Sequence, residues 1–209
     1  MTTIYFKNGT CALGPHIVLE WIGAPYEAKV GLPGTAELLA LNPAGAVPVL
    51  VEDDGWVLTQ NSAIMDYLVG KHPEAGLGGG EGLRAAAERA KWCAFITGDL
   101  HPAFYPVFMA DRYTTDPSDA AKKHVQEAGL KLARKKFAIL DAHLQGRDWM
   151  LDGRSVCDAY LFPMMRWGVF KLGEGMKDYP NVMALHDRLA ADPAVQKVLA
   201  VHAASAKAA

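Results

Sequence analysis

The residues that could do chemistry begin with a cysteine in a turn. Cys11 lies between a β-prone run and a helix expected to begin near Gly14. Backbone N–H groups and the dipole at a helix N-terminus favour a thiolate over a thiol, and they also favour bound anions. We therefore expect Cys11 to be a reactive thiol of lowered pKa. The alternative is a small buried core cysteine, and the residues alone leave both open.

Two short segments could bind a peptide-like ligand. Val47-Pro48 stands before an apolar strand. A cis proline there would direct the N–H and C=O of Val47 outward, where they could pair with a ligand as an added strand does; the alternative is an ordinary trans proline. Gln60, Asn61 and Ser62 precede a helix, where amides, hydroxyls and free N–H groups suit a carboxylate. Simple N-capping by Asn61 or Ser62 is compatible with that role.

A histidine and a serine–aspartate pair complete the polar positions. His101 follows Asp99-Leu100 and precedes Pro102, midway along a long helical segment. It could point across a cleft toward a thiol, or it could be an ordinary core or surface histidine. Ser155 and Asp158 fit a capping box at a helix start, which is a structural role.

Composition excludes several classes of function. The net charge of −2 does not favour nucleic acid or an anionic membrane as the main partner. No apolar run reaches the roughly 18–20 residues that span a bilayer, and no signal peptide is recognisable. Three cysteines and no CxxC or HExxH pattern argue against a disulfide framework and a metal site, so we expect a metal-free protein of the reducing cytoplasm.

The elements around these positions change character along the chain. Strands are expected at residues 3–6, 26–30, 47–51 and 56–59, with helices at 14–22, 36–41 and 61–69. The order βαβ, then ββα, implies parallel strands in the first unit. A Gly- and Pro-rich stretch, 72–80, is the expected linker. We therefore place one domain at 1–77 and an all-helical domain at 84–209.

The second half is expected to be helical. Long segments at 83–113, 120–145 and 155–170 are followed by shorter ones at 181–191 and 193–201. Pro102 and Pro106 predict a kink or break in the first. The second should bury a stripe of Val125, Leu132, Leu140 and Leu144. The tail, 203–209, is expected to be frayed.

Taken together and in order, these motifs resemble the glutathione transferase family, nearest its bacterial beta class. The segment 42–50, NPAGAVPVL, is similar to the family's NPxGxVPxL, whose proline is cis. The segment 58–68, LTQNSAIMDYL, resembles the stretch that binds the γ-glutamyl end of glutathione. The capping box resembles the family's Thr-x-Ala-Asp. Cys11 together with His101 resembles the class's cysteine and facing histidine.

The resemblance implies a thioredoxin-like domain that binds glutathione, followed by a helical domain that binds a small hydrophobic electrophile. It implies catalytic roles for Cys11 and His101. It also implies a homodimer, detoxification as the role, and glutathione as co-substrate. The implied sites have two sets of residues. For glutathione they are Tyr5, Val47, Pro48, Gln60, Asn61 and Ser62, and for the electrophile Phe104, Phe108, Arg112 and Trp167.

Two departures bear on the site. Gln60-Asn61 replaces the usual Glu-Gly pair of the class, and Ala12 replaces a common hydroxyl residue. The expected reaction is attack by a glutathione thiolate on the electrophile. The alternatives are a glutathione-dependent thiol–disulfide oxidoreductase that uses Cys11 and a non-catalytic binder of hydrophobic ligands. The sequence names neither the electrophile, nor the state of Cys11, nor the residue that meets the glycyl carboxylate.

Overall fold

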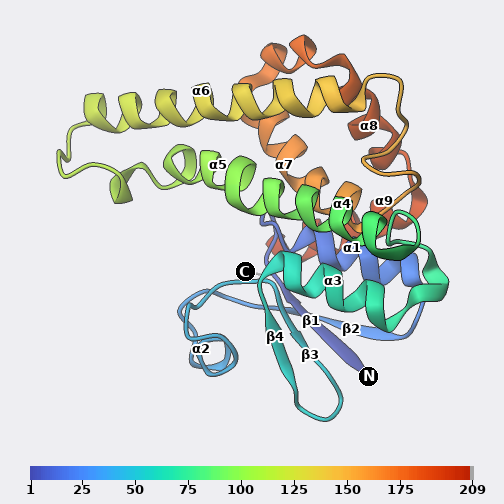
Figure 1. The fold of residues 1–209 in the computed structure, drawn as a ribbon. Coiled ribbons are helices and arrows are strands. Elements are labelled where there is room, and N and C mark those ends of the chain that lie inside the picture. The colour runs from blue at the N-terminus through green and yellow to red at the C-terminus, as the bar shows by residue number, and fades with distance from the viewer. Residues whose placement is uncertain (208–209) are drawn as a thin grey trace.

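The computed structural model, which describes residues 1–207, has a mixed sheet with its helices in the first half of the chain and helices alone in the second (Figure 1). The elements of the first half are β1 (Thr2–Phe6), α1 (Leu13–Ile22), β2 (Tyr26–Val30), α2 (Ala36–Leu41), β3 (Val49–Val51), β4 (Val57–Thr59) and α3 (Asn61–Lys71). This order confirms the predicted thioredoxin-like βαβ–ββα arrangement.

The helical half begins with one long rod that changes its winding midway. α4 (Gly82–Phe95) passes through a π turn, η2 (Ile96–Leu100), into α5 (His101–Phe108). The break predicted near Pro102 is therefore a π turn, with the proline accommodated in the first turn of α5. The later helices are α6 (Asp119–Leu144), α7 (Val156–Leu172), α8 (Pro180–Ala190) and α9 (Pro193–Lys207). Short 3₁₀ turns lie at η1 (Pro73–Ala75), η3 (Ala110–Arg112) and η4 (Gly173–Asp178).

The sheet has the strand order β2-β1-β3-β4. β1 and β2 are parallel, with Thr2 opposite Tyr26, whereas β1–β3 and β3–β4 are antiparallel. Side chains alternate between its faces because successive residues of a strand point in opposite directions. Ile4 and Leu50 therefore join the main core beneath α1 and α3, while Tyr5 and Val49 pack with Leu38 of α2 in a small second core.

Close contact between the two halves depends on a glycine. A Cβ on Gly14 of α1 would lie 3.0 Å from the carbonyl oxygen of Ala159 and 3.2 Å from Cα of Tyr160, both in α7. The absence of a side chain lets α1 approach the α7 backbone. The start of α7 is fixed by the predicted capping box: Asp158 is fully buried and accepts hydrogen bonds from the backbone N–H and hydroxyl of Ser155.

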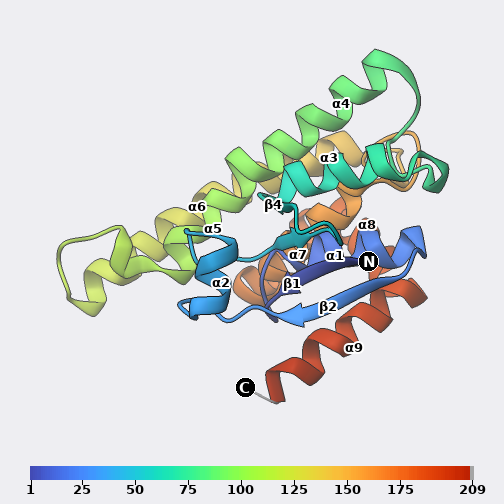
Figure 2. The same cartoon turned by 90° about the horizontal axis from the view of Figure 1, so that it is seen from below.

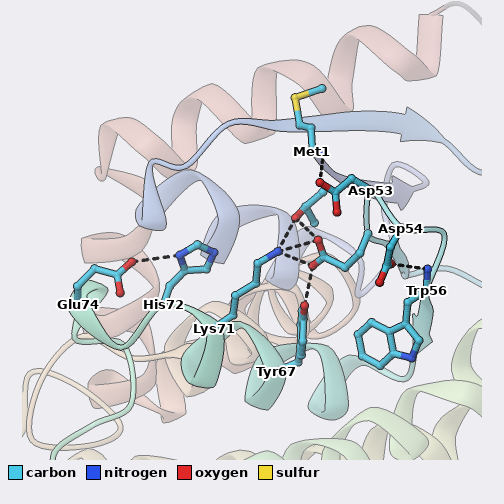
Figure 3. Close-up of polar contacts among 10 residues, drawn as sticks. Met1, Asp53, Asp54, Trp56, Tyr67, Lys71, His72 and Glu74 are labelled. Atoms are coloured by element: carbon cyan, nitrogen blue, oxygen red, sulfur yellow. Dashed lines mark hydrogen bonds and ion pairs between the residues drawn. The ribbon is translucent and has the colours of Figure 1, made fainter.

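A polar cluster fastens the β3–β4 hairpin to α3. Lys71 and Tyr67 of α3 point toward the same carboxylate, beside Asp53 and Asp54 of the hairpin turn (Figure 3). That carboxylate is Glu52, which accepts a hydrogen bond of 2.9 Å from the Tyr67 hydroxyl and pairs with Lys71 at 2.7 Å. The hairpin and the second half of α3 are thereby held in one arrangement.

Two local predictions are wrong. The segment 203–207 is the last part of α9 rather than frayed chain, and positions 208–209 lie outside the described residues. Figure 2 shows α9 beside β2, at the opposite edge of the sheet from α3 and α4. Its contacts with α1 explain why the helix extends that far. On α6, Leu132 is 48% exposed, because the buried stripe runs through Ala133 and Phe137 instead. No helix within the described part of the chain is long and apolar enough to cross a membrane.

Candidate active site

One cavity of about 200 Å³ brings together the segments that the sequence singled out. It lies between the first turn after β1, the segment before β3, the start of α3 and the rod formed by α4 and α5. Its lining residues are Cys11, Asn42, Ala44, Ala46, Val47, Pro48, Gln60, Asn61, Thr97, His101, Tyr105 and Tyr160. Residues far apart in the sequence thus share one small, mainly polar space.

Cys11 is a neutral thiol in this cavity. Burial raises its pKa to about 11, even though a hydrogen bond with Asn61 acts in the opposite direction. Its Sγ lies 4.0 Å from the carbonyl oxygen of Val47, a partner that a thiol suits and a thiolate does not. The expectation of a lowered pKa at Cys11 is wrong, because α1 begins only at Leu13 and loss of water outweighs the helix start.

The ligand-facing backbone is set by two unusual residues. The Val47–Pro48 peptide bond is cis, as predicted. Gln60 has a φ of +72°, the only positive φ at a non-glycine residue in the described chain. Such a conformation costs on the order of 1–3 kcal/mol and is concentrated at functional sites. Asn61 follows it and donates a 2.9 Å hydrogen bond to the carbonyl of Cys11. Its buried Oδ1 has no partner among residues 1–207, so the site holds an unused acceptor.

The helical half contributes a histidine and two tyrosines. Burial lowers the pKa of His101 to about 4, so its imidazole is neutral near pH 7. The His101 ring lies between Tyr105 and Trp167, with centroids 4.9 and 5.2 Å away. Burial, and then the nearby Cys11, raise the pKa of Tyr105, which keeps its hydroxyl protonated. The Tyr160 hydroxyl accepts a 3.0 Å hydrogen bond from Thr97 and keeps its own hydrogen for another acceptor.

A second cavity of about 310 Å³ lies on the other side of the His101–Trp167 contact. Its lining residues are Asn8, Gly9, Thr10, Leu13, Phe108, Pro163, Arg166, Trp167, Phe170, Leu199 and His202. The Trp167 indole N–H donates a 3.0 Å hydrogen bond to the carbonyl of Gly9. This bond joins α7 to the loop before Cys11, so the two cavities share a wall. No cluster of three or more metal-binding side chains is found within the described residues.

The structure does not bring every expected residue to these cavities. Tyr5 lies in the small second core, where its hydroxyl donates to Glu37 at 3.3 Å. Ser62 lines a separate surface hollow beside α4. Phe104 is fully buried behind Phe108 and Trp167, and Arg112 is exposed in η3 away from both cavities.

Sequence reasoning missed several residues that line the cavities, among them Tyr105 and Tyr160 in the first, and Arg166 and His202 in the second. Tyr105 lies four residues after His101, so helical spacing could have placed it on the same face. Arg166 precedes Trp167 in an apolar helix, where a charge is a signal in itself. Nothing in the sequence brings His202 to the loop at Gly9.

Family models cover most of the chain. The N-terminal domain of glutathione S-transferases matches residues 9–70, and the C-terminal domain matches residues 98–193. The chain belongs to the glutathione S-transferase family. A glutathione S-transferase of Xanthomonas campestris, GST-4.5, is 42% identical over 200 residues, which are 94% of this chain and 96% of that protein.

Solved glutathione S-transferases have the same fold. A sphingomonad enzyme complexed with glutathione is 33% identical and superposes with a TM-score of 0.82, covering 96% of this chain and 98% of that one. The bacterial beta-class enzyme of Sphingomonas chungbukensis is 32% identical, also with a TM-score of 0.82 and the same coverage. These glutathione S-transferase relatives do not favour the alternatives of a thiol–disulfide oxidoreductase or a non-catalytic binder.

Proposed function

We propose that this glutathione S-transferase conjugates the thiol of glutathione to small hydrophobic electrophiles, with glutathione in the first cavity and the electrophile in the second. The observation that carries the proposal is the first cavity itself. It joins the cis Val47–Pro48 backbone, the strained Gln60 and the unused acceptor of Asn61 to Cys11 and His101. The sphingomonad relative, which holds glutathione on the same fold, supports it.

The peptide groups and the γ-glutamyl end of glutathione each have a chemical counterpart in this proposal. The backbone of Val47 pairs with the peptide groups of the ligand in the manner of an added strand. The γ-glutamyl carboxylate lies at the start of α3, beside Gln60 and Asn61, where the first N–H groups of the helix are free. The Asn61 Oδ1 atom accepts a hydrogen bond from an ammonium or amide N–H of the ligand.

The glutathione sulfur then needs donors, because a free thiol has a pKa of about 8.5 and is mostly protonated at pH 7. Cys11, His101 and the hydroxyls of Tyr105 and Tyr160 surround the position where it would lie. Neutral hydroxyls stabilise an anionic sulfur without adding a competing charge. In the reaction, the thiol gives its proton to water, a carbon–sulfur bond forms at the electrophilic carbon, and the leaving group departs with its electron pair.

The second cavity supplies the electrophile site in this proposal. Phe108 and Trp167 line it as expected, whereas Phe104 supports them from behind. Arg166 takes the place that the sequence gave to Arg112. Trp167 lines the second cavity and contacts His101 of the first, so the two proposed sites are neighbours.

Further expectations go with this function. We infer a homodimer, a role in detoxification and a cytoplasmic location, supported by the family and by the ordinary charge balance. The domain boundary is proposed between 77 and 84, where the loop before α4 begins. Light scattering at micromolar concentration tests the dimer: a monomer mass would contradict it.

Two assays in parallel test the function. The purified protein should conjugate 1-chloro-2,4-dinitrobenzene to glutathione and should reduce a glutathione mixed disulfide slowly or not at all. Cys11→Ala should keep part of the conjugation, because the neutral thiol is not the nucleophile. Loss of all conjugation in Cys11→Ala, together with fast disulfide reduction by the wild type, would favour the oxidoreductase instead. Calorimetry that finds no glutathione binding at millimolar concentration would refute both.

A further inference from the structure

A chain of hydrogen bonds crosses the protein behind the second cavity. It begins at Glu20 of α1, passes through Tyr26 at the start of β2 and His16 of α1, and ends at His202 of α9. The distances are 2.8 Å from the Tyr26 hydroxyl to Glu20, 3.2 Å from that hydroxyl to His16 Nε2, and 3.1 Å from His16 Nδ1 to His202 Nε2. His16 and His202 are 1% and 2% exposed, so neither is an ordinary surface histidine.

The direction of each hydrogen bond follows from the first. Although burial opposes it, hydrogen bonds from Lys197 and Tyr26 lower the pKa of Glu20, which is an acceptor only. The Tyr26 hydrogen is therefore committed to Glu20, and the hydroxyl oxygen accepts from His16 Nε2–H. Burial lowers the pKa of His16 to about 4, so its ring is neutral and its Nδ1 carries a lone pair.

The same logic fixes the last ring. Burial, and after it the electrostatic effects of His16 and Arg166, lower the pKa of His202 to about 3, so this imidazole is neutral as well. Its Nε2–H donates to His16, which leaves a lone pair on Nδ1. That Nδ1 has no hydrogen-bond partner among the described residues. His202 lines the second cavity, and this nitrogen is the remaining acceptor of its ring.

Arg166 supplies the complementary group. Its guanidinium has no hydrogen bond or ion pair within residues 1–207 and lies 5.7 Å from the Phe162 ring. It is the only permanently charged side chain in the described lining of the second cavity. The rest of the wall is mostly apolar, with Phe108, Trp167 and Phe170 as its aromatic members. The lining of this cavity therefore offers both a cation and an acceptor, and Arg166 is near enough to His202 to lower the pKa of that ring.

We propose that the second cavity selects aromatic electrophiles that carry both a hydroxyl group, donated to His202 Nδ1, and an anionic or carbonyl oxygen, held by Arg166. This specificity rests on the proposed function, because it assigns the electrophile to that cavity. Glu20, Tyr26 and His16 are positioning residues: they do not touch the ligand but keep the acceptor nitrogen of His202 turned toward it. A methyl ether in place of the hydroxyl has no hydrogen to donate and faces a lone pair.

The test compares two ligands that differ in that one hydrogen. Calorimetry at pH 7.5 with 3-hydroxybenzoate and 3-methoxybenzoate should show the hydroxyl compound binding about tenfold more tightly to the wild type, the ratio that one hydrogen bond supplies. Arg166→Gln should weaken both ligands and leave their ratio unchanged. A ratio near one in the wild type, or no binding of either ligand at millimolar concentration, would overturn the proposal.

A remote variant separates positioning from mere stability. Tyr26→Phe removes the acceptor of His16 Nε2–H, so the two histidines can reverse their hydrogen bond and place a hydrogen on His202 Nδ1. The tenfold preference should then fall to about one. Tyr67→Phe is the matched control, because Tyr67 makes the same kind of bond to Glu52, which also pairs with a lysine, away from the cavity (Figure 3). Tyr67→Phe should keep the tenfold ratio, and an equal loss in both variants would refute the argument.

Failure of the proposed function gives a different result. If the wild type fails to conjugate 1-chloro-2,4-dinitrobenzene but keeps the tenfold preference, the catalytic role is wrong and the ligand preference stands. If it conjugates that compound and binds both benzoates equally, the function stands and the preference is wrong. Should Tyr26→Phe fail to fold, the exposed Arg166→Gln and the wild-type ratio still decide the question.

Discussion

The neutral state of His101 leads to a measurable acid sensitivity. The folded-state pKa is about 4, lowered by burial, whereas an unfolded histidine titrates near 6.5. Because the unfolded chain binds more protons between these values, the contribution of His101 to stability is complete above pH 6.5 and is lost as pH falls toward 4. By pH 4.5 the loss amounts to about 2.5 kcal/mol relative to pH 7.5, a large share of a typical stability.

The perturbation that isolates this term is His101→Gln. Other groups also titrate in this range: His16 and His202 act in the same direction, and Asp158, whose pKa burial raises to about 6, acts in the opposite one. Subtracting the variant's free energy of unfolding from that of the wild type at each pH cancels the contributions of these other groups. The free energy of unfolding, from urea titrations followed by tryptophan fluorescence, should decline about 2.5 kcal/mol less in His101→Gln than in the wild type between pH 7.5 and 4.5.

The matched control is His124→Gln, which changes an exposed histidine on α6. Its profile should run parallel to that of the wild type. Parallel profiles for wild type and His101→Gln would show that His101 is protonated in the folded protein as readily as in the unfolded one. That result would refute the description of the first cavity as a water-poor space around a neutral imidazole.

Three further outcomes are expected. Gly14→Ala should lower the free energy of unfolding in urea by about 1–3 kcal/mol, because its Cβ would lie 3.0 Å from a carbonyl oxygen of α7. Gly70→Ala is the control and should not lower it, because a Cβ there meets nothing within 4 Å. Equal effects of the two variants would contradict the close approach of α1 and α7. Iodoacetamide should label Cys11 slowly at pH 7, and the labelling rate should rise about tenfold per pH unit up to pH 9, as a pKa of about 11 requires. A labelling rate independent of pH would show that Cys11 is already a thiolate at pH 7. Trp167→Phe should lower kcat/KM for conjugation by about tenfold, because the variant loses the hydrogen bond to Gly9 that holds the loop before Cys11. An unchanged kcat/KM would show that this hydrogen bond is not needed to hold the loop.

Features encoded locally were predictable from the sequence. The hairpin turn, the capping box of Ser155 and Asp158 and the helix that ends at Gly23 depend on residues a few positions apart, and each formed as expected. The cis proline and the pairing of Cys11 with His101 came from the resemblance to the family rather than from residue chemistry. The structure has the cis bond and places Cys11 and His101 in the lining of one cavity.

Properties that depend on packing were not predictable in the same way. The pKa of Cys11 is decided by the water removed when α5 and α7 cover it, and no local pattern reports that loss. His202 reaches His16 across 186 positions of the chain. On α6, both Leu132 and Ala133 suit a buried stripe, and only the position of the neighbouring helices decides that the alanine faces inward.

The π turn at Ile96–Leu100 determines which side of α5 faces the core relative to α4. Trp92, Ile96, Leu100 and Phe104 recur every fourth position and are all buried. On a regular α-helix each such step overshoots a full turn by roughly 40°, so the stripe would rotate out of the core. A π turn contains about one residue more than an α-turn, so it compensates for this rotation and keeps the four side chains facing the core. His101 directly follows this turn, so the same change of phase also decides that His101 lines the first cavity.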